Sequence, residues 1–189
     1  MSGQRNTNDY ALLISQYHYI YDALDGAAEL LRDTTDLPGV AALLDPMLDR
    51  RKAINNDLTA LLSTTKGSNK PVQLKATEVY ASRIREVTER PELLTAHHYL
   101  RYLGDLHGGL AIAKMVKRHY GLPDEQLQMY TFEGIPKPKL YKDLYRERLN
   151  QVGFTRPQED AFIHEVLAGF EYHKTIFDEL LEYSPHMTE

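Results

Sequence analysis

The 189-residue chain contains no cysteine, and this absence excludes several kinds of site. Zinc fingers, iron–sulfur clusters and thiolate-ligated hemes all need a cysteine sulfur. Disulfide bonds are excluded as well, which is typical of a protein from a reducing compartment. A chain of this length buries enough apolar surface to fold without such cross-links, so we expect residues 1–189 to form a single domain.

The chain also lacks an excess of positive charge and long apolar runs. It has 27 acidic residues against 22 Lys and Arg, which argues against a nucleic-acid partner. No stretch reaches the roughly 18 uninterrupted apolar residues of a membrane span. The first residues are polar and contain no secretory segment, and residues 184–189 contain no anchor. We therefore expect a cytoplasmic protein with no membrane anchor.

Apolar residues recur at helical spacing through most of the chain, and no stretch shows the alternation of a β-strand. The fold class that this predicts is all-α, a single-domain bundle of six to eight helices. A short helix is expected after Pro123. The spacing predicts the longer helices at about residues 9–32, 40–62, 72–88, 91–120, 139–150 and 156–183.

The ends of several helices are marked by capping and breaking residues. Asn6 and its neighbours can cap the first helix, and Thr155 with Gln158 can cap the last. Pro46 lies inside the second predicted helix, which therefore either kinks or begins there. Residues 64–71 and 131–138 are rich in Gly and Pro and are predicted to be irregular connections.

The strongest helical segment, residues 91–120, contains Gly104, Gly108 and Gly109. Each costs about 1 kcal/mol relative to alanine in a helix interior, or roughly 3 kcal/mol together. Gly104 and Gly108 are one turn apart, and their shared face has no Cβ, so another group can approach the backbone and the helix can bend. Close helix packing would explain such a face. Arg101 and Asp105 beside it favour a flat ligand instead.

The run Tyr99-Leu-Arg-Tyr-Leu-Gly-Asp-Leu-His-Gly-Gly109 resembles the distal helix of the heme oxygenases, especially their soluble bacterial branch. The resemblance continues through residues 115–120, 132–135 and 140–146, and it reaches back to residues 19–24 and 44–48. It implies the heme oxygenase bundle, with the distal helix kinked at its glycines. It also implies oxidative cleavage of heme to biliverdin with release of CO and iron, which requires O2 and an external reductant.

Three residues match the catalytic network of that family. Asp105 matches the distal aspartate, which orders water beside the reacting oxygen and steers protons to it. Tyr21 and Arg101 match the residues that hold this network in place. Without the resemblance, Tyr21 would be interpreted as ordinary core packing.

Other residues match positions that bind the heme itself. The glycines correspond to backbone contacts with the porphyrin, Tyr99 and two basic residues to the propionate side, and two phenylalanines to the apolar lining. Lys142 and Arg146 are one helical turn apart and can reach one edge of a ligand, although a solvated basic face would look the same. The predicted heme-binding residues are Gly104, Gly108, Gly109, Tyr99, His107, Lys142, Arg146, Phe170, His173 and Phe177.

The chain departs from the family pattern at the iron ligand. The axial histidine of heme oxygenases lies on an N-terminal helix whose position falls before Met1, so no axial ligand is assigned. Either Met1 is an internal methionine, or the chain is a non-catalytic or re-ligated relative. His107 replaces the usual serine and His173 replaces an asparagine. One hypothesis makes one of them an iron ligand, and the alternative makes both simple hydrogen-bonding replacements.

Three functions compete at this point. The first is heme oxygenase, and the second is a heme-binding or heme-carrying relative without turnover. The third, a carboxylate-bridged di-iron enzyme, needs Glu-x-x-His pairs, whereas Glu159 and His164 are five residues apart. Because no flavin or nicotinamide fingerprint is present, the enzyme would need an electron-donor reductase or a ferredoxin. We expect a monomer or a weak dimer.

Overall fold

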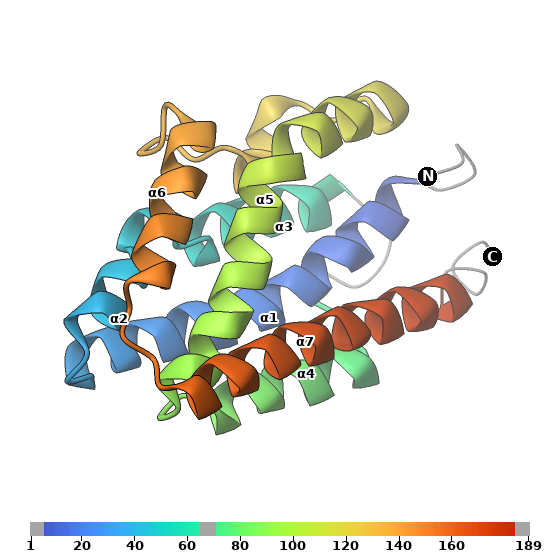
Figure 1. Ribbon diagram of the computed structural model, residues 1–189. Coiled ribbons are helices and arrows are strands. Elements are labelled where there is room, and N and C mark those ends of the chain that lie inside the picture. The colour runs from blue at the N-terminus through green and yellow to red at the C-terminus, as the bar shows by residue number, and fades with distance from the viewer. Residues whose placement is uncertain (1–5, 65–70, 184–189) are drawn as a thin grey trace.

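The computed structural model describes residues 6–64 and 71–183, and these residues form seven α-helices and three short 3-10 helices without any strand (Figure 1). This confirms the all-α class and the expected number of helices. The predicted connection at residues 64–71 lies almost entirely outside the described residues. The elements are α1 (Thr7–Thr34), α2 (Pro38–Leu43), η1 (Pro46–Leu48), α3 (Arg51–Thr64), α4 (Lys75–Glu86), α5 (Pro91–Tyr120), η2 (Asp124–Gln126), η3 (Gln128–Tyr130), α6 (Pro138–Asn150) and α7 (Arg156–Tyr183).

Helix α1 begins at the predicted cap and forms the centre of the core. The Asn6 side chain accepts hydrogen bonds from the N–H groups of Asn8 (2.8 Å) and Asp9 (3.2 Å), and the Asp9 carboxylate accepts one from the Asn6 N–H (2.8 Å). This capping box satisfies backbone donors that have no partner inside the helix. From there α1 packs against α3, α4 and α5, and its buried residues include Ile14, Ile20 and Leu24.

The prediction of one continuous helix over residues 40–62 is wrong, whereas the expected interruption at Pro46 is present. The structure divides this region into α2, η1 and α3, with the break at Pro46. Proline has no N–H to donate and clashes with the preceding turn, so it begins the 3-10 turn at its first position. Asp45 caps that turn by accepting a hydrogen bond from the Met47 N–H at 2.9 Å. The helical spacing of apolar residues continues across the break, although the helix itself does not.

Helix α5 has the predicted bounds and carries the glycine-rich segment. Pro91 stands at its start, and Gly121 ends it in a left-handed conformation (φ 67°) that a residue with a side chain adopts only with strain. Figure 1 shows α5 changing direction in its second half. Gly104, Gly108 and Gly109 lie near the middle of α5 and reduce the resistance of the helix to bending.

Helix α7 packs across α5 and α4 at Gly169, a residue that no sequence pattern marks as special. A Cβ on Gly169 would lie 2.5 Å from the Leu100 Cδ2, so a larger residue cannot fit unless Leu100 moves. At the start of α7 one half of the expected capping box is present, because the Gln158 Oε1 accepts a hydrogen bond from the Thr155 N–H at 3.0 Å, while the Thr155 hydroxyl donates to the same oxygen at 2.9 Å. Gly169 therefore allows the close crossing of α5 and α7.

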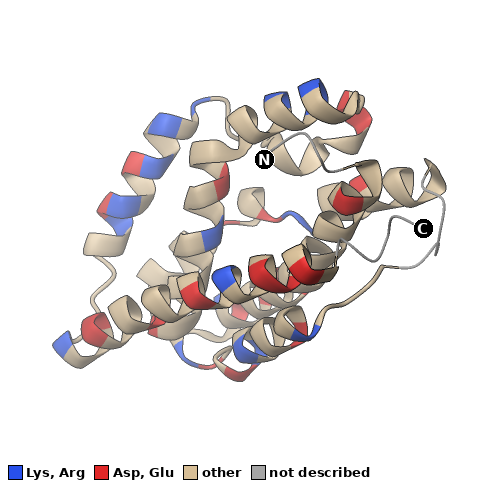
Figure 2. Cartoon of the chain, turned by 90° about the vertical axis from the view of Figure 1, so that its right-hand side faces the viewer, with Lys and Arg blue, Asp and Glu red and all other residues tan. Residues whose placement is uncertain are grey.

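Charged residues of both signs lie along the helices, with several Lys and Arg on α6 and at the far end of α5 (Figure 2). Among the described helices, none combines the length and the apolar character needed to cross a lipid bilayer.

Candidate functional site

A buried polar cluster connects α1 to the centre of α5. The Arg101 guanidinium donates to the Tyr21 hydroxyl through Nε (3.1 Å) and Nη2 (2.8 Å), and its Nη2 lies 3.6 Å from the Asp105 Oδ1. The Tyr21 hydroxyl in turn donates a hydrogen bond to the Asp105 Oδ2. The side chains of Arg101 and Asp105 are 10% and 13% exposed. The structure thus brings together the three residues that the sequence assigned to the catalytic network.

Burial determines the protonation behaviour of this cluster. It raises the pKa of Asp105, while the opposite charge of Arg101, the hydrogen bond from Tyr21 and the charge of Arg50 act to lower it. Burial also raises the pKa of the Tyr21 hydroxyl well above its ordinary value, so Tyr21 stays protonated and acts as a donor. A carboxyl with a raised pKa beside a fixed proton donor is suited to proton transfer.

His173 joins the same cluster from α7. Its Nε2 lies 2.6 Å from the Arg101 Nη1, and its Nδ1 lies 2.7 Å from the carbonyl oxygen of Gly169. Both ring nitrogens of His173 therefore have a partner within the chain. Binding iron through Nε2 would require this nitrogen to leave Arg101.

His107 lies on a different side of α5, toward α6. The Lys142 Nζ donates to the His107 Nδ1 at 3.1 Å, and Lys142 is buried. Arg146, one turn further along α6, is half exposed and pairs with Asp143 at 3.4 Å. The two basic residues predicted for the propionates thus share a helix but differ in setting, because one is enclosed beside His107 and the other faces solvent.

The three glycines of α5 do not have the same surroundings. A Cβ on Gly104 would meet no atom of the described residues within 4 Å, and one on Gly108 would meet only the side chain of Ile112 at 3.7 Å. A Cβ on Gly109 would lie 3.5 Å from the Tyr130 ring, in ordinary contact. Gly109 is therefore covered by Tyr130, although an alanine would also fit there, whereas Gly104 leaves a bare stretch of backbone beside Asp105.

The aromatic residues predicted to line the ligand site are separated in the structure. The Tyr99 ring lies against Phe162 and Tyr145, with ring centroids 5.8 and 6.3 Å apart. Phe170 and Phe177 on α7 are 57% and 45% exposed, so neither belongs to the buried core. Exposed phenylalanines are unfavourable in water and are consistent with an apolar surface that a ligand covers.

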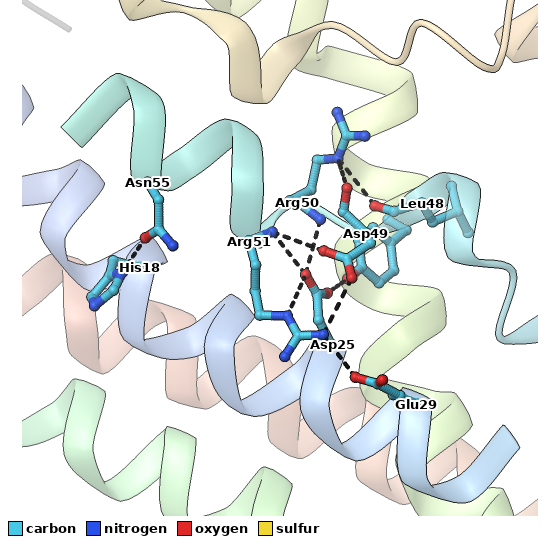
Figure 3. Close-up of polar contacts among 9 residues, drawn as sticks. His18, Asp25, Glu29, Leu48, Asp49, Arg50, Arg51 and Asn55 are labelled. Carbon is cyan, nitrogen blue, oxygen red and sulfur yellow. Dashed lines mark hydrogen bonds and ion pairs between the residues drawn. The ribbon is translucent and has the colours of Figure 1, made fainter. Parts of the chain in front are cut away.

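A second tyrosine–aspartate pair, which was not predicted from the sequence, joins the same two helices. The Tyr102 hydroxyl donates a hydrogen bond to the Asp25 Oδ1, and the Asp25 Oδ2 accepts from the N–H groups of Arg50 (2.9 Å) and Arg51 (2.8 Å). Figure 3 shows Asp25 pointing at the start of α3 together with Asp49, Arg50 and Arg51. One signal was available, because Asp25 follows Tyr21 by one helical turn and so shares its face of α1.

Together, the fold and the site define a helical-bundle protein with an open glycine face beside a buried Arg–Tyr–Asp cluster. Residues 1–179 match the family model described as heme oxygenase, and the chain belongs to this family.

Similar proteins agree with this assignment. The chain is 37% identical over 181 residues to a heme oxygenase of Takifugu rubripes, covering 94% of this chain and 64% of the relative. It is 29% identical to heme oxygenase 1 of Synechocystis, covering 95% of this chain and 74% of that protein. The chain spans 54 to 64% of the length of the first three vertebrate relatives it matches.

Solved structures show the same architecture. The crystal structure of heme oxygenase-1 from the cyanobacterium Synechocystis in complex with heme superposes with a TM-score of 0.84 at 28% identity, over 94% of this chain and 79% of that one. Heme oxygenase from Leptospira interrogans superposes with a TM-score of 0.84 at 30% identity, over 95% of this chain and 86% of that one.

Proposed function

We propose that this chain is a heme oxygenase, which cleaves heme oxidatively to biliverdin and releases CO and iron. The observation that carries the proposal is the bare backbone at Gly104 on α5, directly beside Asp105 and its partners Arg101 and Tyr21. A flat macrocycle needs a surface without side chains, and oxygen chemistry on it needs a controlled source of protons.

A heme would lie on the face of α5 where Gly104 leaves the backbone uncovered. The backbone at Gly104 and Gly108 would contact the porphyrin, and the exposed Phe170 and Phe177 would cover its apolar parts. Tyr99 and Arg146 would face the propionates, whereas the buried Lys142 ammonium would have to leave His107 to reach them. Gly109 would not be part of this surface, because it lies against Tyr130. We assign no axial ligand to any described residue.

Bound heme supplies the iron at which oxygen reacts and the ring that is oxidised. The protein's part is to deliver protons to the right place. Asp105 would hold a water molecule and pass a proton through it, with its raised pKa bringing the carboxyl nearer to neutral pH. Arg101 and Tyr21 would keep the Asp105 carboxyl in one orientation, because Tyr21 donates to one of its oxygens and Arg101 faces the other.

We further propose that electrons come from an external reductase or a ferredoxin. The sequence contains no dinucleotide-binding glycine pattern, and the reaction consumes electrons that heme and O2 do not supply. A monomer or weak dimer in the cytoplasm remains the expectation. Sedimentation across a range of concentrations tests the oligomeric state.

The test of the function begins with the purified chain, heme, a reductant and O2. We expect a biliverdin absorption spectrum and one CO per heme. Heme that binds without yielding biliverdin would contradict the catalytic proposal and would support the heme-carrier alternative.

A second measurement tests the surface that carries the proposal. Gly104→Leu fills the bare stretch of backbone, and we expect it to weaken heme binding by about tenfold or more, which corresponds to roughly 1.4 kcal/mol. Gly26→Leu is the matched control, because Gly26 is also helical and a Cβ there would meet only the Arg51 side chain at 3.9 Å. Equal heme affinities in the two variants would exclude Gly104 from the heme-binding surface.

A further inference from the structure

His173 presents each of its ring nitrogens to a different partner. The Nδ1 lies 2.7 Å from the Gly169 carbonyl oxygen, one turn earlier on α7. The Nε2 lies 2.6 Å from the Arg101 Nη1 on α5. The ring also rests edge-on against Tyr80 of α4, with centroids 5.0 Å apart. Three helices therefore fix the position of this imidazole.

These two contacts determine which nitrogen carries the proton. A carbonyl oxygen only accepts hydrogen bonds, so the His173 Nδ1 must donate to Gly169. A guanidinium only donates, so the Nε2 must offer its lone pair to Arg101. If both ring nitrogens carried a proton, the Nε2–H would point at an N–H group of Arg101, with the two nitrogens only 2.6 Å apart, and the contact would be repulsive. The geometry requires the neutral Nδ1–H tautomer.

The groups around His173 favour the neutral form as well. Burial lowers its pKa to about 3, and the positive charge of Arg101 adds to this effect. The titratable groups that face it are Arg101 and His97 from α5 and Tyr80 from α4. None of them is an acid that would stabilise an imidazolium.

The position of Arg101 matters because its guanidinium is planar. The five N–H groups of a guanidinium form a rigid fork, so an acceptor that holds Nη1 also determines where Nε and Nη2 point. Here Nε and Nη2 both point at the Tyr21 hydroxyl. A free arginine side chain of this length would sample many rotamers.

We propose that His173 is a positioning residue that holds Arg101, through a neutral Nε2 acceptor, in the orientation from which Arg101 donates to Tyr21 and faces Asp105. The catalytic consequence rests on the proposed function, whereas the positioning itself does not. Because the same lone pair cannot serve both Arg101 and iron, this role excludes His173 as an iron ligand in the same state.

The test uses the heme-free chain and nuclear magnetic resonance of nitrogen-15-labelled protein. At neutral pH the His173 nitrogens should show the Nδ1–H tautomer. His173→Phe keeps a ring against Tyr80 but has no acceptor, and we expect the Arg101 Nε–H to exchange with solvent about tenfold faster, the factor that corresponds to losing about 1.4 kcal/mol. His173→Gln restores an acceptor near the position of Nε2 and should keep the exchange rate within about twofold of the original.

The matched control is His164→Phe. His164 lies on the same helix and makes the same kind of contact, with its Nδ1 2.8 Å from the Asp160 carbonyl oxygen, but it is exposed and bonds to no arginine among the described residues. We expect no change at Arg101. An Nε2–H or doubly protonated His173 in the unmodified chain, or an exchange rate unchanged in His173→Phe, would overturn the proposal. If His173→Phe does not fold, the tautomer in the unmodified chain still decides.

Turnover measurements separate the positioning of Arg101 by His173 from the catalytic consequence of that positioning. His173→Phe should lower kcat for biliverdin formation while leaving the KM for heme within about twofold, and His173→Gln should restore kcat. A parallel rise in KM with kcat unchanged would contradict a role through Arg101. Absence of biliverdin from the unmodified chain would remove the proposed function, and the exchange measurements would still decide whether His173 positions Arg101.

Discussion

Two tyrosine–aspartate pairs cross between α1 and α5, and they have opposite surroundings. In one, Tyr21 of α1 donates to Asp105 of α5, and in the other, Tyr102 of α5 donates to Asp25 of α1. The two tyrosine rings meet edge to face, with centroids 5.6 Å apart. The chemistry of the two pairs is the same, and burial raises the pKa of both carboxyls.

The difference lies in what else each carboxyl contacts. Asp25 has both oxygens occupied, since it also accepts from two backbone N–H groups at the start of α3. Asp105 has one oxygen bonded to Tyr21, and the other lies 3.6 Å from Arg101, beyond hydrogen-bond distance. Asp105 also stands next to the open backbone at Gly104. A saturated carboxylate holds helices together, whereas an unsaturated one beside open space can hold water.

The largest expected effect concerns turnover. Asp105→Asn keeps an oxygen for Tyr21 but loses the ability to exchange a proton, and we expect biliverdin formation to fall by about 10²- to 10⁴-fold. Asp25→Asn is the matched control and should leave turnover within about threefold. Single-turnover spectra measure both variants, and equal losses would show that the two carboxyls are not functionally distinct.

The next effect concerns stability, and here the order of the two pairs reverses. Asp25→Ala leaves two backbone N–H groups and a buried hydroxyl without partners, which should lower the free energy of unfolding by about 3–5 kcal/mol. Asp105→Ala removes the partner of the Tyr21 hydroxyl and of Arg101, but these two groups remain bonded to each other, so it should cost less, about 1–2 kcal/mol. Urea unfolding gives both values. A larger cost for Asp105 would reverse our assignment of the structural pair.

The third effect is a pH dependence of the folding stability, which comes from His173 in the cluster around Asp105. The pKa of His173 is about 3 in the folded chain and ordinarily about 6.5, so the unfolded chain binds a proton that the folded chain refuses. The stability from this group is complete above about pH 6.5 and falls by about 1.4 kcal/mol per pH unit below it. His173→Phe should therefore lose less stability than the original chain between about pH 7 and pH 5. Parallel unfolding curves would contradict a buried neutral imidazole.

The smallest expected effect separates two helical glycines. Gly104→Ala has free space and a better helix former, so it should stabilise the heme-free chain by about 1 kcal/mol. Gly169→Ala should destabilise it by about 1–3 kcal/mol, because its Cβ would press on Leu100. Thermal unfolding gives the sign of each change. If Gly104→Ala destabilises the chain, the face at Gly104 is not free.

Most helix positions could be predicted from the sequence, and the three members of the catalytic cluster could be predicted from the family resemblance. The residues that surround individual side chains, such as Lys142, could not. The bounds of α5 were predicted because Pro91 and Gly121 act locally at its ends. The long helix across Pro46 was wrong because apolar spacing reports burial and not chain continuity. The enclosed position of Lys142 beside His107 depends on how α5 meets α6, which no local pattern contains.

By itself, the sequence determined that the chain is helical, where most helices begin and end, and that Arg101, Gly104 and Asp105 share one region of one helix. Spacing along a helix is a local property, so a single chain can be interpreted in this way. Only the tertiary structure decided that Tyr102 meets Asp25, that Gly104 is open while Gly109 lies against Tyr130, and that His173 reaches Arg101. Those contacts join residues on different helices, and they depend on how the packed helices are placed against one another.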